Sequence, residues 1–377
     1  MRAYKFRLYP SKKQEEMLKH HLWIKKELWN TLLEKTKEKY EKEQKFLTIS
    51  EMAELVKGTE LYSQVAQSVF RDLDKSLKAK MRAKSKGQKW GFPRFKPFDR
   101  MKSIHYPQSG FSLARKLSVS PFGEIAIVQH REVKGKVKTL TIKREASGKW
   151  HTIFTVEEEP KTPKVNNGAA VGLDLGLNRL ATLSDGKVIQ NPHHFSRLEQ
   201  KLAEVQRRLS RKHKRSHNWL KARTRVALVH EIIANARKDY LHKAANVLLS
   251  NYSKIAMEDL RIGEMIQKGH GKGIHDASWR MFTNMLCYKA ASAGSEIVFV
   301  DPKDTSKECS CCHALIQKGL WERTHHCPSC GLVMDRDINA AINILTRATA
   351  GMAESNACGD EARLSSLKQE AAPFRVR

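Results

Sequence analysis

The first residues of the chain alternate between apolar and charged side chains. Tyr4, Phe6 and Leu8 fall on one face, with charged residues between them, and this period of two predicts a β-strand. Ser11 and Gln14 then form a capping-box pattern, which predicts the start of a long helix. Apolar residues at helical spacing predict further helices over about 50–85.

Between residues 103 and 159 the apolar period returns to two, and turn residues separate the apolar runs. This stretch therefore predicts a β-rich region, with strands at 124–128, 139–143 and 151–156. The polar segment 161–168 predicts a linker and a domain boundary.

The second half of the chain predicts a mixed α/β region. The expected elements are strands near 169–175, 180–183 and 187–190, a long basic helical stretch over about 195–250, a strand at 253–258, a helix near 276–293, a strand at 296–300 and a helix over about 336–348. A cysteine-rich insert lies at 309–330. The polar tail beyond Gly351 is expected to be poorly ordered.

Three acidic residues occupy positions where a carboxylate needs a partner. Asp174 lies in an apolar run, Glu258 ends another, and Asp337 opens a helix of small residues. Each has an ordinary explanation, as a turn residue, an edge charge or a helix-start acid. Together, in this chain order, they predict an RNase H-like fold that binds two Mg²⁺ ions and cleaves phosphodiesters.

The last helix carries Asp337 on the same face as two small residues, Ala340 and Ala341. Small side chains there would let the helix approach the sheet closely and bring the carboxylate over the strand ends. Asp335 is expected to cap this helix, and Asp259 is expected to point away from its neighbour Glu258.

Two Cys-x-x-Cys pairs lie fourteen residues apart in the insert. This spacing predicts a ribbon that binds one structural Zn²⁺ through four thiolates. The expected ligands are Cys309, Cys312, Cys327 and Cys330. Disulfides are the alternative, and Cys311 leaves the ligand register open because it could replace a neighbour.

The net charge of the chain indicates what kind of molecule it binds. The chain has 69 Lys and Arg residues against 40 Asp and Glu residues, a formal net charge of +29. Such an excess predicts a polyphosphate partner, with an anionic membrane surface as the alternative. No apolar stretch approaches about 18 residues and the start has no signal-peptide pattern, so we expect a cytoplasmic, nucleoid-associated protein.

Two segments are candidates for contact with nucleic acid. The basic run at 201–225 has a single acidic residue, which favours a phosphate-tracking surface over an ordinary solvated helix face. In the loop Arg94-Phe95-Lys96, an aromatic ring between cations suits RNA, although Phe95 could instead pack into a core.

Several motifs together resemble the TnpB family, RNA-guided nucleases of bacterial and archaeal insertion sequences that are related to type V CRISPR effectors. The segments that carry the resemblance are 4–10, 91–96, 172–176, 237–243, 257–260, 305–309, the ribbon and 335–341. They are spread over nearly the whole chain.

The resemblance implies an α+β multidomain protein. A wedge β-barrel would comprise 1–10 and 103–162, and a helical recognition domain, 11–102, would be inserted in it. A RuvC nuclease at 168–304 and 335–350 would be interrupted by the zinc ribbon at 305–334, with a tail at 351–377. The family binds a guide RNA from the element's own end and cuts double-stranded DNA beside a short motif, here expected as a monomer with RNA.

The resemblance also indicates which other functions the chain could have. Some relatives lose the three acids and become RNA-guided repressors, so the intact set argues for cleavage. A DNA-strand transposase would use similar acids without a guide. The recognition helices and the neighbouring wedge are expected to read the adjacent motif. Gln67 on such a helix could pair with adenine or be a solvated helix residue. The expected nucleic-acid contacts are Lys5, Arg7, Ser63, Gln67, Arg94, Phe95, Lys96, Arg207, Arg208, Arg211 and Lys212.

Overall fold

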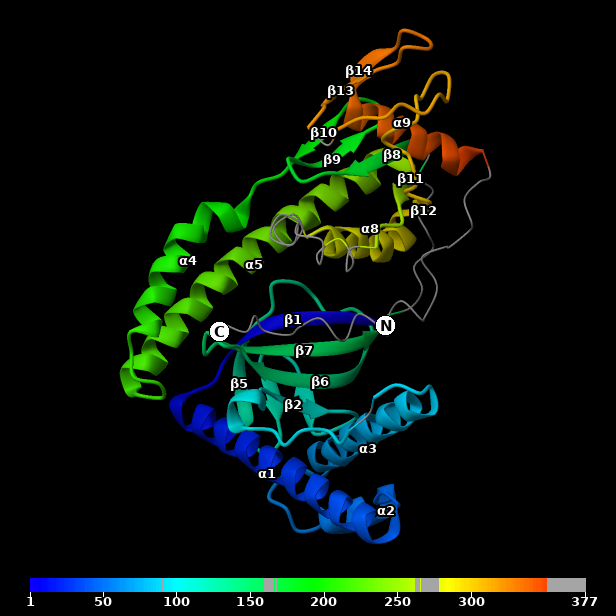
Figure 1. The fold of residues 1–377 in the computed structure, drawn as a ribbon. Coiled ribbons are helices and arrows are strands. Elements are labelled where there is room, and N and C mark those ends of the chain that lie inside the picture. Colours follow the sequence, from blue (N-terminus) through cyan, green and yellow to red (C-terminus); the bar gives the residue numbers. More distant parts are fainter. Residues whose placement is uncertain are drawn as a thin grey trace. The chain divides into compact units, whose positions relative to one another are not determined.

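The computed structural model describes residues 1–89, 91–158, 166, 168–261, 265, 278–319 and 321–350 (Figure 1). The chain divides into two compact units, unit 1 (Met1–Pro160) and unit 2 (Lys161–Arg377). Each unit is built around a hydrophobic core of its own.

Unit 1 contains a seven-stranded sheet in the order β2-β6-β7-β1-β5-β4-β3, which curls into a nearly closed barrel (Figure 1). The strands are β1 (Arg2–Tyr9), β2 (Ser103–Tyr106), β3 (Phe111–Leu113), β4 (Leu117–Val119), β5 (Gly123–Val128), β6 (Lys136–Arg144) and β7 (Trp150–Glu157). β1 lies between β7 and β5 and is antiparallel to both. Its apolar face, Tyr4, Phe6 and Leu8, is buried as the alternation predicts.

Helices α1 (Lys12–Glu43), α2 (Ile49–Leu55) and α3 (Ser63–Ser85) and the short 3₁₀ helix η1 (Phe98–Arg100) are inserted between β1 and β2. The predicted capping box is present, because the Gln14 amide donates to the Ser11 hydroxyl and the Ser11 amide donates to the Gln14 side chain. Gln14 also donates to the carbonyls of Phe122 and Glu124. The cap therefore fastens α1 to β5, and helices and barrel share one core.

Unit 2 contains a five-stranded sheet in the order β10-β9-β8-β11-β12. The strands are β8 (Ala169–Leu175), β9 (Arg179–Leu183), β10 (Val188–Gln190), β11 (Tyr252–Glu258) and β12 (Glu296–Val300). The first three are antiparallel, whereas β8, β11 and β12 are parallel. This is the predicted RNase H-like arrangement. Helices α5 (His217–Asn251) and α8 (Trp279–Ala293) pack on one face, and α9 (Arg336–Thr349) packs on the other.

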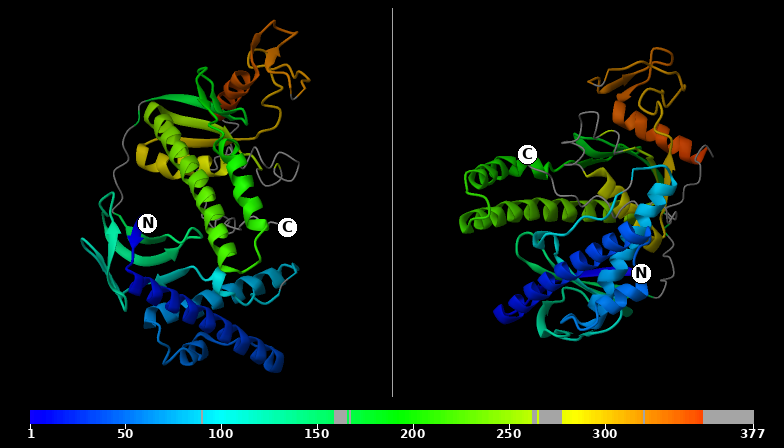
Figure 2. Two further views of the ribbon diagram at one scale, coloured as in Figure 1. Left: turned by 90° about the vertical axis from the view of Figure 1, so that its left-hand side faces the viewer. Right: turned by 60° about the horizontal axis from the view of Figure 1, so that its bottom comes forward.

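The long stretch predicted over about 195–250 is helical, but it is not continuous. The structure has two helices, α4 (His194–Ser210) and α5 (His217–Asn251), which pack against each other (Figure 2). Helix α4 ends at Ser210, and in the connection that follows Arg215 adopts a φ of 71°. Ser216 then caps α5 by accepting from the Trp219 amide. Such a side-chain cap starts a new helix after the break.

The insert between β12 and α9 contains the short antiparallel pair β13 (Thr324–His326) and β14 (Val333–Asp335). The expected disordered tail, most of the linker at 161–168 and the start of the helix expected near 276 lie outside the described residues. Within the described part of the chain, no helix has the length and apolarity needed to span a membrane.

Candidate active site and cysteine cluster

The structure brings the three predicted acids to one edge of the sheet in unit 2. Leu173 on β8 lies opposite Met257 on the parallel strand β11, so the residues that follow, Asp174 and Glu258, lie on neighbouring strands near their carboxyl ends. Asp337 lies in the first turn of α9. The carboxylates therefore come from three elements that are far apart in the sequence.

Close backbone packing brings α9 over the sheet. A Cβ atom on Gly172 would lie 1.9 Å from the carbonyl oxygen of Ala341, so only glycine fits at this point of β8. Ala340 and Ala341 are completely buried. The predicted close approach through small residues is thus present, and it places Asp337 near the end of β8.

The electrostatics of the site reflect this convergence. Burial raises the pKa of Asp174 well above its usual range, and the negative charges of Glu258 and Asp337 raise it further. Burial also raises the pKa of Glu258, while a hydrogen bond from Thr305 and the charge of Arg347 oppose that rise. An all-oxygen donor set with mutually repelling charges fits a hard divalent cation.

The predicted helix cap by the neighbouring acid Asp335 is confirmed. Asp335 caps α9, because its Oδ1 accepts from the amides of Asp337 at 2.9 Å and Ile338 at 3.3 Å. Its Oδ2 accepts from Arg179 at 2.9 Å. Asp259 is exposed.

The four predicted zinc ligands also lie together. Their Sγ atoms are all within 4.8 Å of one another, with 3.6 Å between Cys309 and Cys330 and 3.5 Å between Cys312 and Cys327. A tetrahedral Zn²⁺ with bonds of about 2.3 Å requires sulfur atoms about 3.8 Å apart, so the cluster fits this ion. A disulfide requires about 2.05 Å, and Cys311 lies outside the cluster.

Sequence reasoning missed a polar stripe on α9. Asn339, Asn343 and Arg347 are spaced four residues apart, and the two asparagines are buried. They contact the chain segment that enters the insert, close to Thr305. The regular spacing is visible in the sequence and could have revealed the stripe, but not what it contacts.

In unit 1, the side chains of the predicted RNA-contacting loop lie in two different environments, one exposed and one packed. Arg94 and Phe95 are exposed, and the Lys37 ammonium lies 4.3 Å from the centre of the Phe95 ring, so Phe95 is not a core residue. Lys96 instead lies over the Trp29 ring, 3.1 Å from its centre. Burial lowers the pKa of Lys96 to about 8.

The candidate contacts on β1 already have partners within unit 1. Lys5 forms an ion pair with Glu145 at 2.9 Å, and Arg7 donates to the carbonyl of Trp150 at 2.8 Å. On α3, Ser63 is exposed and Gln67 is partly exposed. Both can be reached from solvent at the start of that helix.

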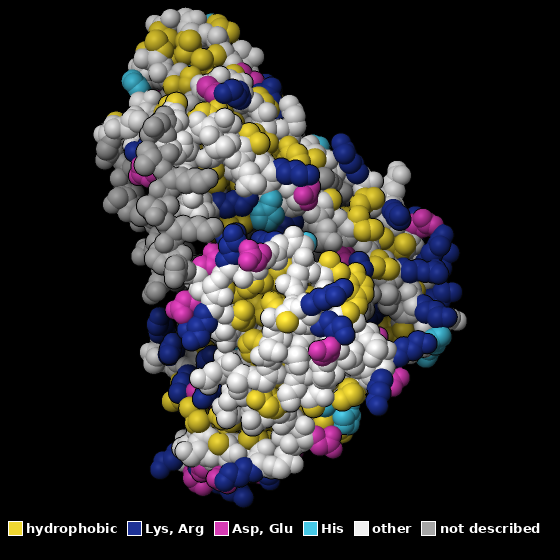
Figure 3. All heavy atoms as spheres, turned by 180° about the vertical axis from the view of Figure 1, so that it is seen from behind, with side chains coloured by type: hydrophobic (Ala, Val, Ile, Leu, Met, Phe, Trp, Pro, Cys, Tyr) yellow, Lys and Arg dark blue, Asp and Glu magenta, His cyan; other side chains and the backbone are white. Residues whose placement is uncertain are grey.

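The basic residues at the end of α4 are exposed, and they are Arg207, Arg208, Arg211 and Lys212. Arg208 pairs with Glu204 one turn away, whereas the connection to α5 adds further exposed cations. On the face drawn in Figure 3, Lys and Arg side chains outnumber Asp and Glu side chains.

Two curated proteins are similar to this chain over nearly its whole length. An Escherichia coli K12 protein named "Putative RNA-guided DNA endonuclease InsQ" is 31% identical over 401 residues, covering 98% of this chain and 97% of that protein. A Streptomyces pristinaespiralis protein named "Putative RNA-guided DNA endonuclease" is 33% identical over 396 residues, covering 98% and 96%. The chain belongs to the TnpB family.

Three family models match parts of this TnpB-family chain. They are described as "Probable transposase" at residues 153–268, "Cas12f1-like, TNB domain" at 279–344 and "Helix-turn-helix domain" at 1–45. In this structure, residues 1–45 contain β1 and the single helix α1, not a helix-turn-helix.

A solved structure supports the same fold for the TnpB-family chain. The cryo-EM structure of a Cas12f1-sgRNA-target DNA complex matches with a TM-score of 0.57 at 15% identity, covering 89% of this chain and 83% of that chain. At this level of identity the likeness concerns the fold alone.

Proposed function

We propose that this protein is an RNA-guided DNA endonuclease of an insertion sequence, which uses a bound guide RNA to find target DNA beside a short motif. The observation that carries the proposal is the convergence of Asp174, Glu258 and Asp337 at one sheet edge. Full-length similarity to proteins named as such endonucleases supports the same function.

The three carboxylates would hold two Mg²⁺ ions, which when bound supply an activated water and stabilise the leaving oxygen of the phosphodiester. Asp174 and Glu258 present their charges from neighbouring strands, and Asp337 presents its charge from α9. Arg179 and the helix cap engage Asp335. Asp335 is thereby kept from competing for the ions.

The cysteine cluster would hold one structural Zn²⁺ and stabilise an insert too short to form a hydrophobic core. In unit 1, the barrel would act as the wedge and the inserted helices as the recognition domain. Guide RNA from the element's end and double-stranded DNA fit the excess of cations. A pairing guide would supply target specificity.

The decisive experiment is purification of the protein together with its nucleic acid. We expect one defined RNA species with a variable 3′ end, and Mg²⁺-dependent cutting of a plasmid that carries the matching target and a randomised flank. Cleavage without RNA, directed to the ends of the element, would identify a transposase instead. RNA-guided binding without cleavage would identify a repressor.

A second measurement tests candidate nucleic-acid contacts in both units. Gln67→Ala should change the flanking motif in the cleavage assay without altering RNA binding, because an amide can pair with adenine in two hydrogen bonds. Arg207→Ala or Arg211→Ala should weaken binding to every target alike and reduce its salt dependence. An unchanged motif for Gln67→Ala would place the base reader elsewhere.

A further inference from the structure

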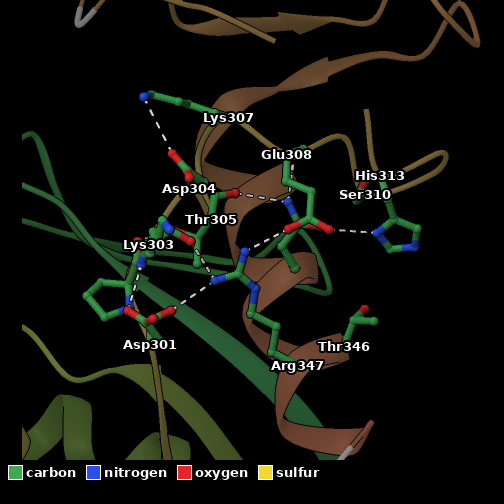
Figure 4. A network of polar contacts seen from close by, with 12 residues as sticks. Asp301, Lys303, Asp304, Thr305, Lys307, Glu308, Ser310, His313, Thr346 and Arg347 are labelled. Atoms are coloured by element: carbon green, nitrogen blue, oxygen red, sulfur yellow. Dashed lines mark hydrogen bonds and ion pairs between the residues drawn. The ribbon is translucent and has the colours of Figure 1, made fainter. Parts of the chain in front are cut away.

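The segment that enters the ribbon insert reaches one of the candidate catalytic carboxylates. We call residues 301–310 the insert stem (Figure 4). The hydroxyl of Thr305, in the middle of the stem, donates a hydrogen bond to Oε1 of Glu258. Thr305 is buried. The stem is therefore part of the surroundings of Glu258, and it also carries Cys309, the first cysteine of the cluster.

Helix α9 holds the stem through two buried amides. The side-chain nitrogen of Asn343 donates to the carbonyls of Thr305 at 2.9 Å and Glu308 at 2.7 Å. The nitrogen of Asn339 donates to the Glu308 carbonyl at 2.7 Å, and its oxygen accepts from the Ser310 amide at 2.9 Å. Buried polar groups that lose such partners are destabilising, so the stem is fixed on this face of α9.

Arg347 holds the start of the stem in the same way (Figure 4). Its Nη1 donates to the carbonyls of Asp301 at 3.0 Å and Lys303 at 2.6 Å. Its Nη2 donates to the carboxylate of Glu308 at 2.7 Å. A planar guanidinium with several fixed donors can bridge these groups, whereas a lysine cannot.

Helix α9 therefore makes contacts through two different faces. One face carries Asp337, Ala340 and Ala341 against the sheet. The adjacent face carries the polar stripe against the stem. Because one rigid helix fixes both Asp337 and the stem, the position of Thr305 beside Glu258 is set relative to the other carboxylates.

On the basis of the proposed endonuclease function, we propose that Thr305 is a positioning residue for Glu258. Asn343 and Arg347 act through Thr305 by holding the stem. The hydroxyl engages one oxygen of Glu258, which fixes the orientation of the carboxylate and leaves the other oxygen for a cation. Residues that orient a metal ligand in this way strongly affect metal affinity.

The test is Thr305→Val, which removes the hydroxyl and keeps the side-chain shape. Mn²⁺ serves as the probe, with its binding to the full-length RNA complex measured by electron paramagnetic resonance in the absence of DNA. We expect Mn²⁺ affinity to fall by about tenfold or more. The Mn²⁺ concentration for half-maximal cleavage should rise by a similar factor, while target binding and zinc content stay at wild-type levels.

Two further variants serve as controls. Thr305→Ser retains a hydroxyl and should recover most of the Mn²⁺ affinity. Thr346→Val makes the same chemical change at an exposed site on α9, where the hydroxyl donates to the Ile342 carbonyl at 3.0 Å, and should leave Mn²⁺ affinity unchanged. Arg347→Gln should weaken Mn²⁺ binding less than Thr305→Val does, because it acts through the stem.

The outcomes separate this proposal from the proposed function. Wild-type Mn²⁺ affinity and cleavage in Thr305→Val would overturn the positioning role and leave the nuclease assignment standing. A wild-type protein that neither binds Mn²⁺ nor cleaves would overturn both. If Thr305→Val does not fold, Thr305→Ala and Thr305→Ser provide a pair of variants with smaller side chains, which differ from each other only in the hydroxyl. Equal Mn²⁺ affinity in that pair would also overturn the positioning role.

Discussion

The cysteine cluster and the carboxylate site lie in the same unit, but the chain assembles them in opposite ways. The thiols come from two tight turns, in which the amides of Cys309 and Cys327 donate to the carbonyls of Ala314 and Leu332. The carboxylates come from two strands and a helix. Among the described residues, the four thiols form the only group of three or more Cys, His, Asp or Glu ligand atoms that all lie within 4.8 Å of one another.

This difference matches what the two proposed sites would require. Four thiolates would complete the coordination of Zn²⁺, so a tight cluster suits the proposed structural site. The proposed two-metal site would have to leave positions for water and for phosphate oxygens, so its carboxylates need not form one tight cluster. Burial raises the pKa of Asp174 most, and the nearby charges of Glu258 and Asp337 raise it further because the carboxylates repel one another.

The largest effect is expected from removing a candidate catalytic ligand. Asp174→Asn should lower the rate of target cleavage by about 10³-fold or more, because metal-ion stabilisation amounts to several kcal/mol in the transition state. Zinc content and RNA binding should be unchanged. The matched control is Asp259→Asn, an exposed carboxamide substitution beside Glu258, which should cleave normally. Wild-type cleavage by Asp174→Asn would remove Asp174 from the site.

Loss of a thiol should act through structure instead. Cys327→Ser should lower the zinc content from one ion per chain to none and unfold the insert, because metal binding supplies most of its folding free energy. Cleavage should fall as well, since the insert connects the stem to α9. Elemental analysis and limited proteolysis between residues 309 and 335 measure these effects. Active wild-type protein without zinc would contradict the structural role.

The close approach of α9 to β8 is expected to matter both for the stability of unit 2 and for the carboxylate site. Gly172→Ala forces a Cβ atom toward the Ala341 carbonyl, which should destabilise unit 2 by about 1–3 kcal/mol and reduce cleavage. Gly91→Ala is the control, because a Cβ there meets nothing within 4 Å. Equal thermal midpoints for the two variants would show that the helix does not depend on this contact.

A smaller effect concerns stability without metal. Asp174 has a higher pKa in the folded chain than in the unfolded chain, so the free energy of unfolding falls as pH rises from about 3.9 toward the folded value. At pH 7 in EDTA, Asp174→Asn should therefore unfold at a higher temperature than wild type. The increase should be roughly 2–4 °C for each kcal/mol gained in the free energy of unfolding. At pH 3 the difference should vanish. A lower midpoint at pH 7 would contradict the raised pKa.

The smallest effect tests the ligand register. Cys311→Ser should leave zinc content, stability and cleavage unchanged, because Cys311 is exposed and lies outside the cluster. Zinc titration of Cys312→Ser gives the complementary measurement. If Cys312→Ser keeps its zinc and the double variant with Cys311→Ser loses it, Cys311 can act as a substitute ligand.

Local patterns anticipated much of the fold. The capping box at Ser11, the alternation in β1 and the small-residue face of α9 each have a physical signature within a few residues, and each is present in the structure. The helix break near Arg215 was not anticipated, because it depends on one left-handed residue and a cap within a basic run. The polar stripe on α9 was missed because its partners lie in the insert stem.

The sequence by itself determined which ligands are available and which helix face is small enough to pack closely, because these depend on residue type and on spacing along one element. Tertiary structure alone decided that β8 lies beside β11, that Gly172 touches the backbone of α9 and that Thr305 reaches Glu258. These contacts join segments far apart in the chain, and no local pattern specifies them, since their energies arise only when the sheet, the helix and the stem pack together.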